Sequence, residues 1–283
     1  VVAGTLAVSL LSACGASNEP QNISDVSSAA SSEATSTTAS SESTGDAAQE
    51  LTFVLSNIPD GLDPSVTNNS FAQYVLINCF EGLVTYDSTG TLVPGNAESW
   101  DISDDGLTYT FHLRDGLKWS DGTDLTAKDF EYSFKRMANP DTAAPYAATC
   151  LGMIDGFDAA QAGDTDALNV KASDDGKTLT IVLAYPCSYF DKMAAFAAMS
   201  PVQQATVEAN GDSWCTSADT FVSNGPYMIT DWTPSERIVL TKNPNYVGGW
   251  DHSKIVSDTI TLLLLEDSSA AFAAYNSGEA VLI

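Results

Sequence analysis

The sequence predicts a mixed α/β protein, in which helices are combined with short antiparallel hairpins. Two observations carry this prediction. Polar and apolar residues alternate over 108–113, as they do in a half-buried strand. Turn sequences containing Asp and Gly, at 87–90, 104–106 and 174–176, each lie between two such segments, as the turns of β-hairpins do. The pattern favours an α+β or α/β sandwich architecture.

In chain order, the apolar run 51–55 predicts a buried strand, which ends at a turn rich in Asp, Gly and Pro over 58–64. A helix is predicted over 70–81, followed by the hairpins. The sequence Thr-Ala-Lys-Asp at 126–129 resembles a capping box, with Asp in place of Glu. It predicts the start of a second helix, whose apolar face is formed by Phe130, Phe134 and Met137.

The composition excludes some classes of function. At 283 residues and 44% apolar content, the chain is long enough for one or two domains with a substantial core. It carries 11 Lys and Arg against 37 Asp and Glu, a formal net charge of -26. Such a charge repels phosphate backbones and anionic lipid headgroups, so we expect no nucleic-acid partner.

The first fourteen residues resemble the end of a lipoprotein signal peptide. Residues 1–11 form an uncharged apolar run, and Ser12 and Ala13 then lead to Cys14. Because a bilayer-spanning helix needs about 20 apolar residues, the run is too short to be one. We therefore expect residues 1–14 to be a signal peptide and lipobox, and Cys14 to carry the lipid. A buried N-terminal strand is the alternative.

Residues 15–50 predict a disordered tether. This segment is dominated by Ser, Thr, Ala and acidic residues and contains no Lys, Arg or aromatic residue. It cannot bury enough apolar surface to offset the entropy lost on ordering. With the lipid anchor, the tether places the protein on the outer face of the cytoplasmic membrane or in the periplasm.

The remaining cysteines are consistent with export but leave their oxidation state open. Cys79, Cys150, Cys187 and Cys215 show no CxxC spacing, so one or two disulfides and four buried thiols are both compatible with the sequence. The two histidines are not close to any of them in the sequence. We predict no metal site and no cofactor.

No catalytic motif stands out. The chain has no nucleophile elbow, no phosphate-binding loop and no motif of a catalytic triad. Its carboxylate pairs, at 104–105 and 174–175, lie in predicted turns, where solvated capping explains them. We therefore expect a protein that is not an enzyme, with a secreted glycosidase as the remote alternative.

Several motifs occur in a characteristic order along residues 51–283. They are FEGLV at 80–84, SW at 99–100, DGLTYTFHLRDGLKWSDG at 105–122, TAKDF at 126–130, SNGPY at 223–227 and NPNY at 243–246. This combination resembles the oligopeptide/dipeptide/nickel family of ABC-transporter solute-binding proteins. Most of these residues have structural roles: Gly106, Gly116 and Gly122 supply turns with positive φ, Trp100 and Trp119 pack in cores, and Asp121 braces a loop.

The resemblance implies a two-lobed fold of the periplasmic-binding-protein type II kind. One lobe of such proteins is formed by domains I and II and the other by domain III. Here the implied boundaries are 51–90 for the first part of domain I, 91–200 for domain II and 201–283 for the continuation of domain I. Residues 267–279 look like the helix before the hinge, so we expect the chain to hold the first lobe and to be truncated before the second.

The implied function is the substrate-binding component of an ABC importer. Such a protein captures small peptides and delivers them to a permease and ATPase complex. We expect it to be a monomer. A peptide-signal receptor on the same fold is an alternative, as is a binder of nickel chelates, haem or oligosaccharides. In peptide-binding members, the backbone before the Leu-Asp-Pro motif runs beside the peptide. That segment corresponds here to Ser56, Asn57, Ile58, Pro59 and Asp60.

A second contact is implied at Tyr146, which follows Pro145 and matches a Ser-Pro-Tyr region of the family. Both expectations have a structural alternative. The segment 56–60 would otherwise be an ordinary turn at the end of a strand, and Tyr146 would be a tyrosine packed within a loop.

Overall fold

The computed structural model describes residues 49–57, 59 and 61–281. The predicted lipidation site Cys14 lies outside the described residues, as do Ile58 and Asp60 of the predicted binding segment. Within the described part, no helix is long and apolar enough to cross a membrane.

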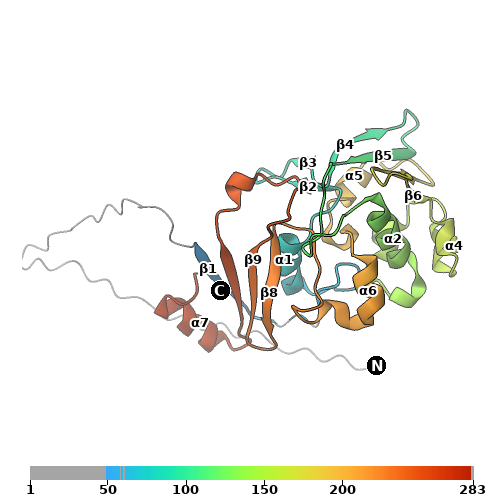
Figure 1. Cartoon of the computed structure of the whole chain (residues 1–283). Coiled ribbons are helices and arrows are strands. Elements are labelled where there is room, and N and C mark those ends of the chain that lie inside the picture. Colours follow the sequence, from blue (N-terminus) through green and yellow to red (C-terminus); the bar gives the residue numbers. More distant parts are fainter. Residues whose placement is uncertain (1–48, 58, 60, 282–283) are drawn as a thin grey trace, which may run out of the picture. The chain divides into compact units, whose positions relative to one another are not determined.

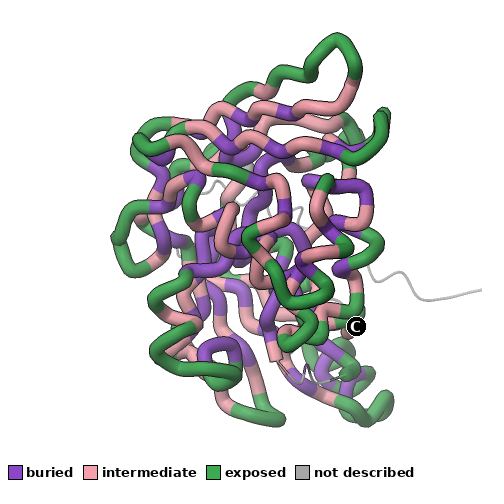
Figure 2. The backbone as a smooth tube through the Cα atoms, turned by 90° about the vertical axis from the view of Figure 1, so that its right-hand side faces the viewer, coloured by how far each residue is buried: buried purple, intermediate pink, exposed green. Residues whose placement is uncertain are grey.

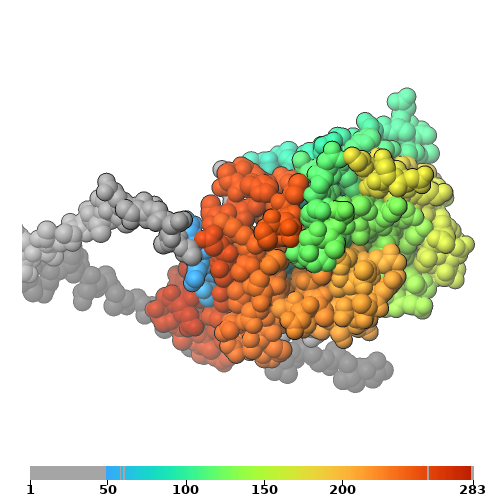
Figure 3. Space-filling model, in the orientation of Figure 1, coloured from blue at the N-terminus to red at the C-terminus, as the bar shows by residue number. Residues whose placement is uncertain are grey.

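The first sheet joins segments from the two ends of the described chain (Figure 1). Its strands are β1 (Glu50–Leu55), β8 (Tyr227–Thr233), β9 (Arg237–Lys242) and β10 (Thr259–Leu264), in the order β1-β10-β9-β8. β1 pairs in parallel with β10, and the other neighbours are antiparallel. Figure 3 shows the same proximity, with blue β1 beside the red end of the chain. The apolar run at 51–55 therefore forms the predicted strand.

The second sheet is antiparallel throughout. It contains β4 (Ala97–Ile102), β5 (Thr108–Leu113), β7 (Thr178–Val182) and β6 (Val170–Ala172), in that order. A hairpin of β2 (Val84–Tyr86) and β3 (Leu92–Pro94) precedes it. All three Asp/Gly turns join paired or neighbouring strands as predicted, and β5 alternates between half-buried and buried residues.

Helices pack on both sheets. The longer ones are α1 (Ser70–Cys79), α2 (Ala127–Ala138) and α7 (Ser268–Ser277). The shorter α-helices are α3 (Ala147–Leu151), α4 (Phe157–Gln161), α5 (Phe190–Met193) and α6 (Gln204–Asn210). Short 3₁₀ turns are η1 (Pro140–Thr142), η2 (Thr165–Ala167), η3 (Ala197–Met199), η4 (Gly211–Cys215) and η5 (His252–Lys254). α1 contacts β8, whereas α2 contacts β6 and β7.

The structure confirms the predicted start of the second helix, α2, and the predicted positive φ at three turn glycines. α2 begins at the capping box, in which Asp129 accepts from the Thr126 backbone and the Thr126 side chain accepts from the first turn. Gly106, Gly116 and Gly122 have φ of 70°, 76° and 86°. α1 ends at Cys79, two residues earlier than predicted, because Phe80 is extended at φ −125° and ψ 151°.

The core is dominated by buried aromatic and aliphatic residues (purple in Figure 2). Trp119 is buried within it, and Trp100 is half-buried, with its ring centroid 6.4 Å from that of Phe111. The cysteines of the described part are free and buried thiols: Cys79, Cys150, Cys187 and Cys215. The structure therefore selects the thiol alternative over the disulfides.

Candidate functional site

The segment that follows β1 is held at both of its ends. At its start, the backbone N–H of Leu265 donates to the carbonyl of Leu55 at 3.1 Å. At its end, the N–H of Leu62 donates to the carbonyl of Cys215 at 3.0 Å, and the Leu62 side chain is fully buried. Between these anchors Ser56 and Asn57 are exposed. Of the described residues of the sequence-predicted binding segment, Ser56 and Asn57 thus lie at the surface, whereas Pro59 is buried.

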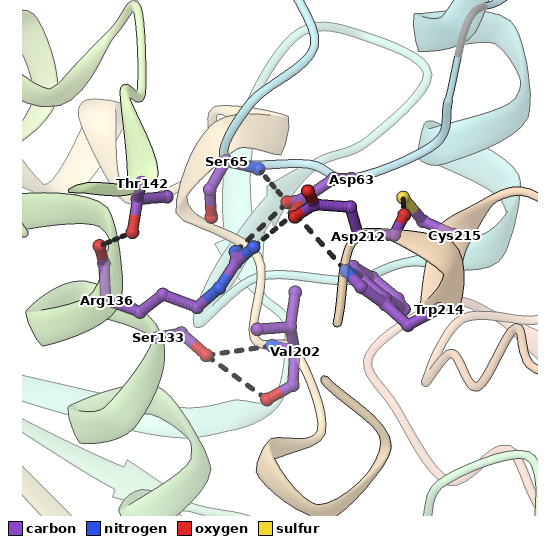
Figure 4. Close-up of polar contacts among 9 residues, drawn as sticks. All are labelled: Asp63, Ser65, Ser133, Arg136, Thr142, Val202, Asp212, Trp214 and Cys215. Carbon is purple, nitrogen blue, oxygen red and sulfur yellow. Dashed lines mark hydrogen bonds and ion pairs between the residues drawn. The ribbon is translucent and has the colours of Figure 1, made fainter. Parts of the chain in front are cut away.

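Asp63 lies directly after this segment and is the acceptor at the centre of a buried polar cluster (Figure 4). The guanidinium of Arg136, on α2, donates from Nη2 to Asp63 Oδ2 at 2.5 Å and from Nη1 to Oδ1 at 3.2 Å. The Ser65 N–H donates to Oδ1 at 2.9 Å, and the Trp214 indole N–H donates to Oδ2 at 3.3 Å. Both carboxylate oxygens therefore accept two hydrogen bonds each.

In this cluster the positive charge of Arg136 lies next to the negative charge of Asp63. Burial disfavours the charged form of Arg136, but the hydrogen bonds and negative charge of Asp63 outweigh burial, so the pKa of Arg136 is raised. Arg136 therefore stays a cation. The Cys215 thiol is also in this cluster, and burial, together with the negative charge of Asp63, raises its pKa to about 11. The thiol is neutral at physiological pH and is not an activated nucleophile.

A cavity of about 650 Å³ adjoins the cluster. Three stretches of chain line it: residues 61–69, the end of α2 with η1, and residues 207–216. Asn69 lines the cavity and donates from Nδ2 to Oδ1 of Asn57 at 2.8 Å. Asn57 of the predicted segment is therefore tied directly to the cavity wall, and the same Asn69 caps α1 through Phe71.

Tyr146 is placed differently. It is half-buried, and its ring meets that of Phe196 edge-on, with a centroid distance of 5.2 Å and an interplanar angle of 89°. It does not line the 650 Å³ cavity, and no described hydrogen bond joins it to Ser56, Asn57 or Pro59. The structure therefore bonds Asn57 to Asn69 of the cavity wall and leaves Tyr146 in an aromatic contact outside the cavity.

No motif in the sequence points to Arg136 or Trp214 as partners of Asp63. They lie 73 and 151 positions from Asp63, and no local pattern links them to it. Asp63 itself was part of the turn at 58–64, where its residue type predicted only turn chemistry. Only a correlation between the residue types at these distant positions would identify the cluster from sequence.

Glu81 is a second buried carboxylic acid, with only 3% of its surface exposed. The Tyr246 hydroxyl donates to Oε1 at 2.9 Å, and the Gly249 N–H lies 3.1 Å and 3.0 Å from the two carboxylate oxygens. Burial raises its pKa to about 7 despite these hydrogen bonds and the nearby Arg114. The amide of Asn96 also donates to the Glu81 carbonyl, at 2.6 Å. Glu81 therefore ties the β2–β3 region to the loop after β9.

Within the described residues, no group of three or more His, Cys, Asp or Glu side chains is arranged to hold a metal ion. The carboxylate pairs in the turns instead cap backbone N–H groups. Asp105 accepts from the Leu107 N–H at 3.0 Å, and Asp175 accepts from the Lys177 N–H at 3.1 Å. This is the solvated capping that the sequence indicated.

The motifs, sheets and helices described above define a solute-binding protein of the extracytoplasmic type. The chain belongs to the bacterial extracellular solute-binding proteins, family 5: the model of that family's middle region matches residues 91–283. This confirms the family predicted from the motifs, and it supports an extracytoplasmic location.

Similarity to individual relatives is strong but partial. The chain is 40% identical over 222 residues to the periplasmic oligopeptide-binding protein OppA of Salmonella typhimurium, covering 77% of this chain and 40% of that protein. It is 37% identical over 224 residues to the Escherichia coli protein named "Probable deoxycholate-binding periplasmic protein YgiS", covering 78% and 40%. The chain thus spans about 40% of the length of these relatives.

Solved structures agree. The chain superimposes on Haemophilus influenzae OppA, solved in complex with the peptide RPPGFSPFR, with a TM-score of 0.76 and 32% identity. The match covers 83% of this chain and 45% of the other. The predicted fold class is confirmed: a mixed α/β chain with the periplasmic-binding-protein type II architecture, over part of the length of its structural relatives.

Proposed function

We propose that this chain is part of the substrate-binding component of an ABC importer, which captures small peptides and delivers them to a membrane permease and its ATPase. The similarity to oligopeptide-binding proteins carries this proposal, since it covers more than three quarters of the chain. In this proposal the protein binds and hands over its ligand without chemical change and acts as a monomer.

The proposed binding surface begins at residues 56–60. A peptide lying along this backbone would be bound as an added strand, through main-chain hydrogen bonds that do not depend on its side chains. The exposure of Ser56 and Asn57 supports this proposal, because both residues are accessible from solvent. Tyr146 is proposed as a second contact, through the part of its surface that Phe196 leaves uncovered.

The proposed domains correspond closely to the two larger sheets. Residues 51–90 and 201–283, the proposed domain I, supply most of β1 and all of β8, β9 and β10. Residues 91–200, the proposed domain II, supply β4 to β7. The proposed boundary at 90/91 falls in the turn of the β2–β3 hairpin. This arrangement supports a domain I that is discontinuous in sequence.

The proposed anchor is a lipid on Cys14, which would hold the protein at the outer face of the cytoplasmic membrane through the tether 15–50. Two lipid chains on one cysteine supply the double hydrophobic signal that stable attachment needs. Replacing Cys14 by Ala in the natural precursor is expected to abolish incorporation of labelled fatty acid. Unchanged labelling would exclude this anchor.

Peptide binding is tested by calorimetry on the natural full-length protein with the variants Asn57→Pro and Asn57→Ala. Proline removes a main-chain donor and restricts φ, so it is expected to cost about 1–3 kcal/mol of binding free energy if that amide pairs with the peptide. Alanine keeps the backbone and loses the hydrogen bond to Asn69, so its effect on binding is expected to be much smaller. Thermal melting establishes that both variants fold. Wild-type affinity in the proline variant would show that residues 56–60 do not receive the peptide.

The similarity to YgiS favours one further candidate, a ligand of the bile-acid type. The same calorimetry, with deoxycholate in place of peptide, separates the two. Binding of peptides but not of deoxycholate supports the peptide importer, and the reverse result supports the second candidate. A receptor for peptide signals would also bind peptides, and uptake of labelled peptide by cells distinguishes an importer from it.

A further inference from the structure

Ser56, Asn57, Pro59 and Gly61 lie in the sequence between two anchors, Leu55 and Leu62. Leu55 is fixed by the sheet, where it pairs with Leu264, and Leu62 is fixed by Cys215. A connection this short has few conformations once both ends are fixed, because the conformational freedom of a chain segment falls with its length. The position of the segment therefore depends on how firmly its second anchor is held.

Asp63 holds that second anchor. Its carboxylate bonds to Arg136 on α2 and to Trp214 in η4, and the carbonyl of the neighbouring Cys215 is the acceptor for Leu62. The carbonyl of Asp63 also accepts from the N–H of Thr67 at 3.0 Å, which closes the turn that follows. One residue thus connects the end of the segment to two separate parts of the fold.

The partners of Asp63 are themselves held firmly. Trp214 is 1% exposed, and its ring is stacked on Phe221 with a centroid distance of 5.9 Å and an interplanar angle of 4°. The Arg136 side chain is 15% exposed and extends from the last turn of α2, a helix that packs on β6 and β7. The anchor therefore does not move with a surface loop.

We propose that Asp63 is a positioning residue for ligand binding: through Arg136 and Trp214 it fixes Leu62, the anchor that follows Ser56, Asn57 and Pro59, and so helps to place these residues for the peptide. This inference rests on the proposed function of that segment. A segment that is already ordered loses less conformational entropy when the ligand binds, so the bonds of Asp63 raise affinity without touching the ligand.

The variant Asp63→Asn tests the proposal because an amide cannot replace both carboxylate oxygens. Asp63 Oδ1 accepts from Arg136 and from the Ser65 N–H, and Oδ2 accepts from Arg136 and from the Trp214 indole N–H. Every group directed at Asp63 is a donor, so the NH₂ of Asn meets two donors in either orientation. Trp214→Phe is the milder variant, since it removes one donor and keeps an aromatic ring against Phe221.

The first measurement is amide hydrogen exchange of the natural full-length protein, followed by mass spectrometry. In Asp63→Asn, residues 55–62 are expected to exchange at least ~10-fold faster, while β5 and β7 keep wild-type rates. Trp214→Phe is expected to show a smaller increase in the same residues. Faster exchange in β5 and β7 as well would indicate general destabilisation, and unchanged exchange at 55–62 would show that Asp63 does not hold the segment. Either result overturns the proposal.

The second measurement is peptide affinity, at a temperature where each variant is folded. Asp63→Asn is expected to weaken binding by ~5–30-fold, and Trp214→Phe by less. The control is Lys135→Gln, on the same helix, which removes two ion pairs that do not involve Asp63: a partly buried one with Glu131 and one with the exposed Asp166. Its affinity is expected to equal that of wild type.

The two hypotheses fail in different ways. If the wild-type protein binds no peptide, the proposed function is wrong, whatever Asp63 does to hydrogen exchange. If the wild type binds peptide and Asp63→Asn binds equally well, the function stands and the positioning role of Asp63 is wrong. An equal loss of affinity in Lys135→Gln would also overturn it, because the effect would then not be specific to Asp63.

Discussion

Glu81 is held in a site that favours its neutral form. Burial raises its pKa to about 7, whereas the unfolded chain has the ordinary value of about 4.5. Between these two values the folded protein keeps a proton that the unfolded chain releases. Folding stability is therefore highest below pH ~4.5 as far as this group is concerned, and it is lost as the pH rises through 7. Tyr246 and Arg114 reduce the shift without abolishing it.

We predict that Glu81→Gln weakens this pH dependence. In wild type, the contribution of Glu81 falls by up to about 3 kcal/mol between pH 4.5 and pH 7.5. Glutamine does not titrate, and its oxygen still accepts from Tyr246. Urea unfolding of both proteins at pH 5 and pH 7.5 measures the difference.

A matched control for Glu81→Gln is Glu98→Gln, a substitution of the same type at an exposed position of β4. It is expected to keep the wild-type pH dependence. If Glu81→Gln also keeps it, the carboxyl group of Glu81 does not titrate in this window, and the account of its burial is wrong.

At the scale of single elements, α2 depends on its capping box. The Thr126 hydroxyl accepts from the Lys128 N–H at 3.3 Å, and Asp129 accepts from the Thr126 N–H at 2.8 Å. We predict that Thr126→Ala lowers the free energy of unfolding by about 1 kcal/mol, because donors of the first turn lose their acceptor. Thr126→Ser keeps the hydroxyl and is expected to restore most of the loss in urea unfolding. Equal losses in both variants would show that the methyl group, rather than the cap, stabilises the helix.

Elements of this kind could be predicted from sequence because their determinants are local. The alternation over 108–113 and the capping box each depend on residues a few positions apart, and both are confirmed. The end of α1 was predicted two residues too late because its cause is distant. The N–H of Gly225 donates to the Cys79 carbonyl at 2.7 Å, and Phe80 packs edge-on against Phe221.

The candidate site was predictable only in part, for the same reason. The family motif identified residues 56–60, and the structure ties Asn57 to Asn69, which lies only 12 positions away. The parallel pairing of β1 with β10 joins residues about 200 positions apart, such as Leu51 and Ile260. Neither this pairing nor the bonds of Asp63 to Arg136 and Trp214 leave a periodic signal in the sequence.

At the scale of the whole molecule, charge is the dominant long-range term. The chain has 37 acidic residues and 11 Lys and Arg, so most carboxylates have no basic partner available to them. Several of the described ion pairs are exposed, among them Lys177 with Asp115, and such pairs add little to stability because water and salt screen them. Repulsion among the remaining carboxylates is relieved when the chain unfolds and the charges move apart.

We therefore predict that salt stabilises the protein near pH 7. Raising NaCl from 10 mM to 300 mM shortens the Debye length from about 30 Å to less than 10 Å, which screens the repulsion between distant carboxylates more than the contact ion pairs. The midpoint of thermal unfolding is expected to rise by several degrees. Choline chloride at equal ionic strength is expected to act alike, since screening does not depend on the identity of the cation. The increase should shrink at pH 4.5, where part of the carboxylates are protonated and the net charge is smaller. A midpoint that falls with salt at pH 7 would show that the ion pairs, Asp63 with Arg136 foremost among them, outweigh the net repulsion.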